Sequence, residues 1–378
     1  MKKTLIIFIL ILFSSIKAQT FDNNLPDAII NKGINQIYNL KFDAAKKTFE
    51  KIKTKNLPAF YFFKSMLLWW EILLDLNNES KDDLFIETID TTIDFCDSQL
   101  DKDENNSLAL FFKGGALGFK GLLQSIRMDW FSAVANGADA LELVYTAYNL
   151  DSSNVDLKLG FGIYNYFAEA LPEKYPAAKP LMIFLPSGNK TLGLQQLHQV
   201  AEDGRFAKIE AKYTLVKIYH LFEKKYFNAI PLEEELIAQF PDNPIFLRYY
   251  GKSLIAQYGY KNAYPIFEKI YLRCTKGDFG FNENFRREAA YYLGMKQMSL
   301  GENNSALKYF AECETLCRKI DKKDNGFLTN SILYQGMLFD LLNRRPEAIE
   351  KYKQVLDVKN YKQAHEKAEK YLEKQYQK

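Results

Sequence analysis

The chain has 378 residues, of which 47% are hydrophobic and 26% charged, and its formal net charge at pH 7 is +3. This composition is that of a folded protein and excludes an intrinsically disordered one. Nucleic-acid binding needs a marked excess of positive charge, and 50 basic against 47 acidic residues give an excess of only three. We therefore expect no nucleic-acid partner.

Residues 1–18 have the parts of a secretory signal peptide. Lys2 and Lys3 precede an apolar run at 5–13, and Ala18 ends the segment before Gln19. The run is shorter than the ~20 residues of a spanning helix, and no cysteine follows that could carry a lipid. Cleavage would leave 50 − 3 = 47 basic and 47 acidic residues. We expect a periplasmic or secreted mature chain without a further membrane segment.

Helical periodicity dominates the remaining sequence. Helical segments are predicted, in chain order, at 26–53, 58–100, 107–150, 154–171, 190–201, 205–240, 244–273, 286–320 and 329–358, with a polar capping helix at 361–377. Prolines 172, 176, 180 and 186 predict a non-helical, proline-rich insertion at 171–193. The organisation predicted is one continuous array, divergent over 19–204 and regular over 205–378.

A glycine, an alanine and an aromatic residue recur with steps of twelve and then four residues. The sets are Gly33, Ala45 and Phe49; Gly251, Ala263 and Phe267; Gly294, Ala306 and Phe310; and Gly336, Ala348 and Tyr352. Small residues allow two helices to approach closely, and the aromatic residue lies on the same helical face as the alanine. A repeated helix–turn–helix unit of this kind predicts a solenoid.

These residues resemble the tetratricopeptide repeat (TPR). The best match contains Leu293-Gly294, Gly301, Ala306 and Phe310, whereas Lys217 stands where the repeat usually has glycine. The resemblance implies an all-α fold, a right-handed α-solenoid of helical hairpins with a C-terminal capping helix. A fainter, local resemblance links residues 188–194 to eukaryotic outer-membrane inclusion-body-clearance proteins, which are also repeat proteins.

The resemblance also implies where a partner would bind. In TPR proteins, ligands lie in a groove formed by the first helices of the pairs. The matching groove positions are Arg248, Lys252, Ile255, Glu288, Tyr291, Met295, Met298 and Met337. This mixture suits a protein or extended peptide with an acidic and an apolar part. The function expected is a non-catalytic scaffold or adaptor in an envelope-associated complex, without a cofactor or metal.

Two other functional classes stay open. A carrier of an apolar small molecule or lipid could use Trp69, Trp70 and the loop around Leu181 and Phe184, although the tryptophans also suit a core and the loop could simply pack over neighbouring helices. An all-helical enzyme acting on polysaccharide needs paired carboxylates. The acidic run at 233–235 is more typical of a solvated face.

The histidines and cysteines give weaker indications. His198, His220 and His365 are far apart in sequence, which argues against a metal site, and His220 is predicted to be a packed core histidine. The four cysteines are expected to be buried free thiols, with a Cys274–Cys313 bridge as the alternative.

Overall fold

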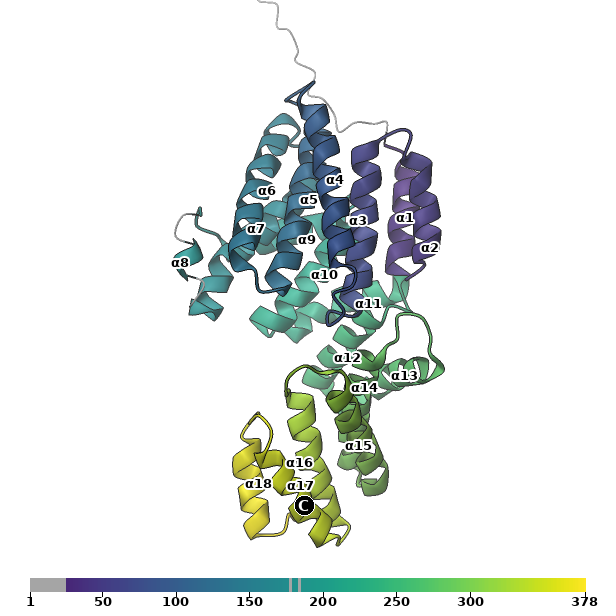
Figure 1. Cartoon of the computed structure of the whole chain (residues 1–378), viewed down its shortest axis with the longest axis vertical. Helices are drawn as coiled ribbons and strands as arrows, with labels where there is room; N and C mark the ends of the chain where they lie inside the picture. Colours follow the sequence, from purple (N-terminus) through teal and green to yellow (C-terminus); the bar gives the residue numbers. More distant parts are fainter. Residues whose placement is uncertain (1–24, 177–178, 183–184) are drawn as a thin grey trace, which may run out of the picture.

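The computed structural model describes residues 25–176, 179–182 and 185–378, which form helices and no strand. The predicted signal peptide lies outside the described residues. The helices, shown in Figure 1, are α1 (Asp27–Tyr38), α2 (Phe42–Phe49), α3 (Leu57–Leu74), α4 (Asp82–Leu100), α5 (Ser107–Ile126), α6 (Trp130–Leu150), α7 (Lys158–Lys174), α8 (Lys179–Met182), α9 (Lys190–Asp203), α10 (Lys208–Ile218), α11 (Tyr226–Gln239), α12 (Pro244–Tyr258), α13 (Tyr260–Lys276), α14 (Glu283–Leu300), α15 (Asn303–Ile320), α16 (Gly326–Leu341), α17 (Arg345–Leu356) and α18 (Ala364–Glu373).

The predicted glycine–aromatic pairs are contacts between the two helices of each hairpin. A Cβ added at Gly251 would lie 2.7 Å from the ring of Phe267, and one at Gly336 would lie 2.6 Å from the ring of Tyr352. The same contact joins Gly33 to Phe49 and Gly294 to Phe310. Each ring therefore fills the place of a missing side chain. The array of helical hairpins is TPR-like, as the spacing predicted.

Asparagine begins helix after helix along the chain. Its side-chain oxygen accepts a hydrogen bond from a backbone N–H in the first turn, which satisfies a donor that the helix itself leaves free. The asparagines with this role are Asn56, Asn106, Asn154, Asn189, Asn243, Asn282 and Asn325. These caps explain why most helix starts agree closely with the segments read from the sequence.

Helix α3 is apolar around most of its circumference, with Lys64 and Glu71 as its charged residues, and other helices pack around it. Its two tryptophans are almost fully buried: Trp69 packs on Phe85 of α4, and Trp70 on Tyr213 of α10 and Phe246 of α12. Among the described helices only α3 has the length and composition of a membrane-crossing helix, and 72% of its apolar window is buried in the fold. A helix that is apolar around most of its circumference is typical of a core.

The first hairpins fold back onto the later repeats. Tyr38, the last residue of α1, donates from its hydroxyl to Glu210 of α10 (3.2 Å). Asn243, which caps α12, donates to the carbonyl of Tyr38 (2.9 Å), and Asn282, which caps α14, donates to the carbonyl of Leu74 at the end of α3 (2.8 Å). In Figure 1, α1–α7 form an upper body, and α12–α18 extend below it.

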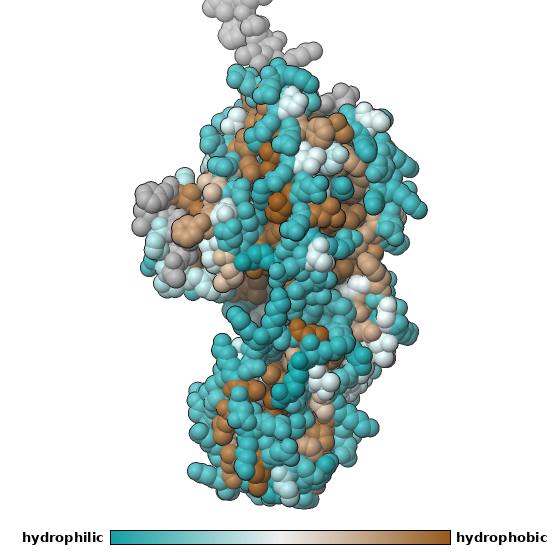
Figure 2. All heavy atoms as spheres, viewed as in Figure 1, coloured by the Kyte–Doolittle hydropathy of each residue, from teal (hydrophilic) through white to brown (hydrophobic). Residues whose placement is uncertain are grey.

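The molecular surface reflects this two-part shape. In Figure 2 the face shown is mostly hydrophilic, with apolar strips between helices, and it narrows at the level of α12–α14. One large buried cluster joins residues of α1–α5 with residues of α10–α14, and a second cluster lies within α14–α18. The helical hairpins follow one another without a break in sequence, but helices α1–α5 also pack against helices α10–α14.

The proline-rich segment differs partly from the prediction. Helix α7 continues to Lys174 and contains Pro172, so the insertion begins later than residue 171. Proline close to the end of a helix removes one N–H and leaves the preceding turns intact. Leu181 lies in the short helix α8, and Phe184 lies outside the described residues. Helix α9 begins at Lys190, as predicted, after its Asn189 cap.

The predicted polar cap at the C-terminus is helix α18. It buries Ala364 and Ala368 against the last hairpin, while most of its other side chains remain accessible. The chain then returns to α16, where the backbone N–H of Tyr376 donates to the carboxylate of Asp340 (2.9 Å). Helix and tail together close the end of the array, which a stack of repeats requires.

Candidate functional site

Three of the predicted groove residues meet between α12 and α14. Lys252 Nζ lies 2.5 Å from Glu288 Oε1, and Arg248 Nε lies 3.8 Å from Glu288 Oε2. The glutamate side chain is only 4% exposed, whereas those of Arg248 and Lys252 are 32% and 27% exposed. The side chains of both cations are therefore partly exposed, whereas the anion between them is buried.

The charges in this cluster depend on each other. Burial alone would raise the pKa of Glu288, but Lys252 and Arg248 hold that pKa below its ordinary value. Burial lowers the pKa of Lys252, and Glu288 opposes this shift. The buried Nε of Arg248 has no hydrogen-bond partner among the described residues. The cluster carries two cations and one anion, so a second carboxylate can be accommodated electrostatically.

A second group of predicted residues lies further along α14. Tyr291, Met295 and Met298 pack partly buried against Phe310 of α15 and Leu338 of α16. The Tyr291 ring lies 5.9 Å from that of Phe310. Thioether and phenol side chains adapt to varied apolar shapes. We call the surface formed by Arg248, Lys252, Glu288, Tyr291, Met295 and Met298 the α12–α14 face.

Two further predicted groove residues contribute less. Ile255 is partly buried against the large core cluster. Met337 is only 9% exposed and packs inside the second cluster, so its assignment to the groove is wrong. Its neighbours Leu333 and Asp340 on α16 are also buried, and Asp340 accepts a hydrogen bond from the backbone N–H of Tyr376 in the C-terminal tail.

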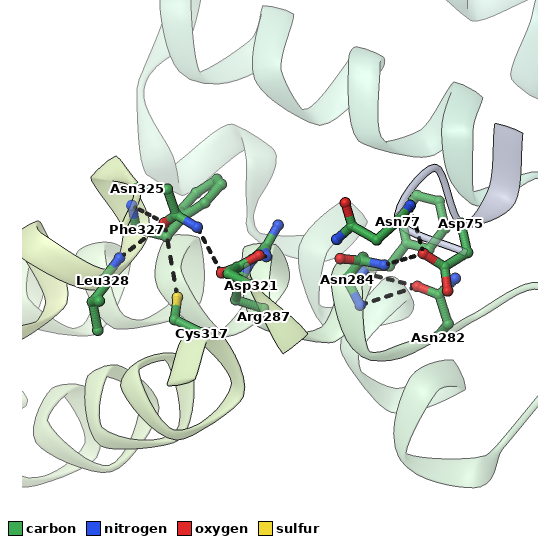
Figure 3. A network of polar contacts seen from close by, with 11 residues as sticks. Asp75, Asn77, Asn282, Asn284, Arg287, Cys317, Asp321, Asn325, Phe327 and Leu328 are labelled. Carbon is green, nitrogen blue, oxygen red and sulfur yellow. Dashed lines mark hydrogen bonds and ion pairs between the residues drawn. The ribbon is translucent and has the colours of Figure 1, made fainter. Parts of the chain in front are cut away.

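The position of α14 is fixed at its start by two polar networks, shown in Figure 3. Asn284 donates to Asp75 of the α3–α4 loop (3.0 Å), next to the Asn282 cap. On the other side Arg287 pairs with Asp321, which accepts a hydrogen bond from Asn325, the cap of α16 (2.6 Å). Because Arg287 precedes Glu288, these contacts also orient the ionic cluster.

The sequence interpretation missed a buried ionic group at the α10–α12 junction. Glu233, assigned to a solvated face, is 1% exposed. Its carboxylate lies 2.7 Å from His220 Nε2 and accepts a hydrogen bond from Ser253 (3.1 Å). Glu233 stands sixteen residues after Lys217, the step that elsewhere links glycine to its aromatic partner. Lys217 thus takes the place of the glycine and Glu233 the place of the aromatic residue. This replacement at both positions is the sequence signal that indicates a buried Glu233.

This histidine–glutamate–serine group does not have the geometry of a catalytic triad. One ring nitrogen, Nε2 of His220, contacts both Glu233 (2.7 Å) and Ser253 (2.8 Å). A triad needs the base to contact the nucleophile with one nitrogen and the orienting acid with the other. Ser253 is also fully buried. The group is a structural core network, and His220 is a packed core histidine as predicted.

Two hollows of the described surface are lined by none of the residues of the α12–α14 face. One of about 320 Å³ is lined by His198, Ala201, Glu202, Lys208, Lys212, Leu232 and Glu235. Another of about 310 Å³ lies between α6 and the insertion and includes Tyr145, Leu185 and Pro186. Neither contains Trp69 or Trp70, which are part of the core. The tryptophans therefore do not line a ligand pocket in this structure.

The thiols carry no cross-link in the structure. All four cysteines are free, so the alternative Cys274–Cys313 bridge is not formed. Cys96, Cys313 and Cys317 are buried, and burial raises the pKa of Cys96 and of Cys274 to about 12. A thiol with a raised pKa is a poor nucleophile at neutral pH.

No family model and no curated protein matches the chain. It is similar to the C-terminal part of a TPR repeat-containing protein from Cytophaga hutchinsonii (16% identity, covering 80% of this chain and 98% of that one, TM-score 0.39). It is also similar to yeast Tom70 (14%, 92% and 82%, TM-score 0.38) and to the apo quorum sensor NprR from B. thuringiensis (13%, 93% and 82%, TM-score 0.35). These TM-scores are low, and the TPR-like fold is established by the packing of the hairpins.

Proposed function

We propose that the protein is a non-catalytic adaptor of the cell envelope, which binds a segment of another protein on the α12–α14 face. The observation that carries this proposal is the pairing of the partly exposed Arg248 and Lys252 of α12 with Glu288 of α14. Tyr291, Met295 and Met298 follow Glu288 on α14 at steps of three, seven and ten residues, which place them on the same side of that helix. The partner segment would present a carboxylate to the cations and an apolar side chain to the methionines.

The two halves of this face contribute in different ways. A carboxylate that approaches Arg248 and Lys252 meets a cluster already half neutralised by Glu288, so its attraction is moderate and mainly orients the segment. The tyrosine and methionine side chains provide apolar area and adaptable packing, which give most of the affinity at protein interfaces. The envelope location rests on the signal sequence at 1–18.

The test uses neutral substitutions at the ionic cluster. Reversal of both charges, Arg248→Glu with Lys252→Glu, would add two carboxylates beside the buried Glu288 and disturb folding. We therefore compare Lys252→Gln, Glu288→Gln and a control, Lys261→Gln on exposed α13. The probes are two 15-residue peptides that carry leucines and either glutamates or glutamines, and calorimetry measures their dissociation constants.

The proposal predicts opposite changes in the affinity for the glutamate peptide in Lys252→Gln and Glu288→Gln. Lys252→Gln should weaken binding of the glutamate peptide about five- to tenfold, and Glu288→Gln should strengthen it because both cations lose their internal partner. Lys261→Gln and the glutamine peptide should show no such differences. Equal binding of the glutamate peptide by all variants, with helicity intact by circular dichroism, would show that the peptide does not bind at the α12–α14 face.

A further inference from the structure

A second exposed surface lies at the joint of the α3–α4 and α5–α6 hairpins. Met128, Trp130 and Phe131 occupy three of four consecutive positions and are 69%, 43% and 78% exposed. Leu76 of the adjacent loop is 41% exposed. We call these four residues the hairpin-end patch. Other exposed large apolar residues, such as Phe227 and Phe279, are not in such a run, and single exposed residues are ordinary.

One ion pair holds the two loops of this patch together. Arg127 at the end of α5 donates to the carbonyl of Leu76 (2.7 Å) and pairs through Nε with Asp82 at the start of α4 (2.5 Å). The side chains of Arg127 and Asp82 are 21% and 17% exposed. Since neither residue has a free charge, the arginine supplies no net positive charge to the patch.

The backbone conformation at Met128 is one that methionine does not favour, so the turn itself does not explain a methionine at this position. Its φ is +68°, in the left-handed region, which glycine, asparagine and aspartate adopt at less cost than methionine. The side chain is 69% exposed and is therefore not retained by packing in the free chain. A partner that covers Met128 would explain an apolar residue at this position.

The neighbouring helix α4 borders the patch with negative charge. It contains six acidic residues and no lysine or arginine. Three of them pair with basic residues of α5 and its end: Asp82 with Arg127, Asp90 with Lys120, and Asp97 with Lys113. Asp83, Glu87 and Asp94 are exposed, and the structure gives them no ion pair within the described residues. Their spacings of four and seven place them on one face of the helix.

We propose that the hairpin-end patch and this acidic face of α4 together dock a basic amphipathic segment of a protein partner. The charge selects the occupant. A lysine- or arginine-rich helix with one apolar side can pair with Asp83 and Glu87 while its apolar side covers Trp130 and Phe131. An anionic lipid surface would be repelled by the same carboxylates. This site is separate from the α12–α14 face and does not depend on it.

Trp130 provides a direct reporter of occupancy. The chain has three tryptophans, and Trp69 and Trp70 are 2% and 0% exposed. Acrylamide in solution therefore quenches mainly Trp130. The probe is an 18-residue amphipathic helical peptide of lysine and leucine, titrated at physiological salt. A scrambled peptide of the same composition, a glutamate–leucine counterpart, and vesicles of neutral and anionic phospholipid are compared with it.

The expected result is a saturable blue shift with protection from acrylamide for the amphipathic basic peptide alone. Phe131→Ser, and separately Asp83→Asn with Glu87→Gln, should weaken binding about tenfold, and the second variant should also reduce its salt dependence. The matched controls are Phe227→Ser, and Asp43→Asn on α2 with Glu50→Gln directly after α2, and these residues are exposed and distant in sequence. The controls should bind like the wild type.

Three outcomes would overturn the proposal. Equal binding of the scrambled peptide would reduce the effect to nonspecific charge attraction. A shift with vesicles but not with the peptide would identify a lipid surface instead. Wild-type affinity in both patch variants, with unchanged circular dichroism, would place the peptide elsewhere. Folding is not at risk in these variants, because Phe131, Asp83 and Glu87 are exposed.

Discussion

The ring of Phe267 lies where a side chain on Gly251 would have to be. This contact repeats at equivalent positions along the chain, and it makes the small size of the glycine a packing requirement rather than a conformational one. Gly118 of α5 is different, because a Cβ added there meets nothing within 4 Å. The two helical glycines form a matched pair that separates packing from helix propensity.

We expect Gly251→Ala to destabilise the protein and Gly118→Ala to stabilise it slightly. Both changes gain helix propensity of up to about 1 kcal/mol. At Gly251 the new methyl group would lie 2.7 Å from a buried ring, and such overpacking costs about 1–3 kcal/mol. Urea unfolding followed by circular dichroism measures both. Similar stabilisation of the two variants would contradict the role assigned to the aromatic ring.

Glu288 is the residue on which the charge of the α12–α14 face depends. Lys252 and Arg248 hold its folded-state pKa below the unfolded value of about 4.5. A lowered folded-state pKa means that the folded chain binds fewer protons near pH 4 than the unfolded chain does. The stabilisation is therefore complete above the unfolded pKa and is lost as the pH falls through the folded value. Glu210, whose pKa burial raises, has the opposite effect.

We expect Glu288→Gln to reduce the free energy of unfolding at pH 7 by about 1–2 kcal/mol. This figure is below the usual cost of breaking a buried pair, because Lys252 and Arg248 remain partly exposed to water. At pH 3 the difference between wild type and variant should be smaller than at pH 7, because the stabilisation is lost as the pH falls through the lowered folded-state pKa. Chemical denaturation at both pH values gives the difference directly and cancels the contribution of Glu210. A difference independent of pH would show that Glu288 is not ionised by its neighbours.

At the scale of the elements, asparagine caps do more than begin helices. Asn243 and Asn282 cap α12 and α14 through their side-chain oxygens, and their amide groups donate to the last carbonyls of α1 and α3. Asn106 caps α5 in the same way, and the structure gives its amide group no partner within the described residues. Asn106 therefore only caps its helix, whereas Asn243 and Asn282 each cap a helix and also bind it to a distant part of the chain.

This difference predicts the effect of aspartate at the three positions. Aspartate keeps the capping oxygen but removes the amide donor and places an oxygen near a carbonyl. Asn106→Asp should change stability by less than about 0.5 kcal/mol, whereas Asn243→Asp and Asn282→Asp should each cost about 1–3 kcal/mol. Thermal and urea unfolding test the ranking. Equal effects at all three positions would leave no role for the amide contacts.

Most helical segments could be predicted from the sequence, because helix caps and the glycine–aromatic spacing depend only on residues close together in the chain. Two elements were misjudged for physical reasons. Proline 172 lies near the end of α7, where its missing N–H interrupts little, so proline count overestimated the insertion. Met337 follows the helical spacing of a groove residue, but it packs inside the cluster formed by α14–α18 and is buried. Local periodicity contains no information about how neighbouring hairpins pack around a residue.

At the scale of the molecule, the main feature is the contact between the first hairpins and the middle repeats. Tyr38 and Glu210 are separated by 172 residues, and Asn282 and Leu74 by 208. No repeat pattern encodes contacts at these separations, so the sequence predicted an array and not its winding. The large buried cluster spans α1–α5 and α10–α14, whereas the last hairpins have a core of their own.

This arrangement predicts how stability is distributed. Amides of α1, α3, α10 and α12 share one core, and we expect them to exchange hydrogen through one common opening with the same free energy. Amides of α17 and α18 should exchange at a lower free energy because their cluster is smaller and terminal. Hydrogen exchange with mass spectrometry at increasing urea gives both values. Clearly weaker protection of α1 and α3 than of α10 and α12 would contradict a shared core.

Site-specific photo-crosslinking tests the binding of a protein segment at the α12–α14 face most directly. A photoreactive residue replaces Met298 on this face or, as the control, Phe227 on α11, in the chain expressed in its native cells. The account predicts a discrete adduct from position 298, absent at position 227, and reduced when Lys252→Gln is also present. Adducts of equal yield from both positions, or an adduct from 298 that is indifferent to Lys252, would contradict it.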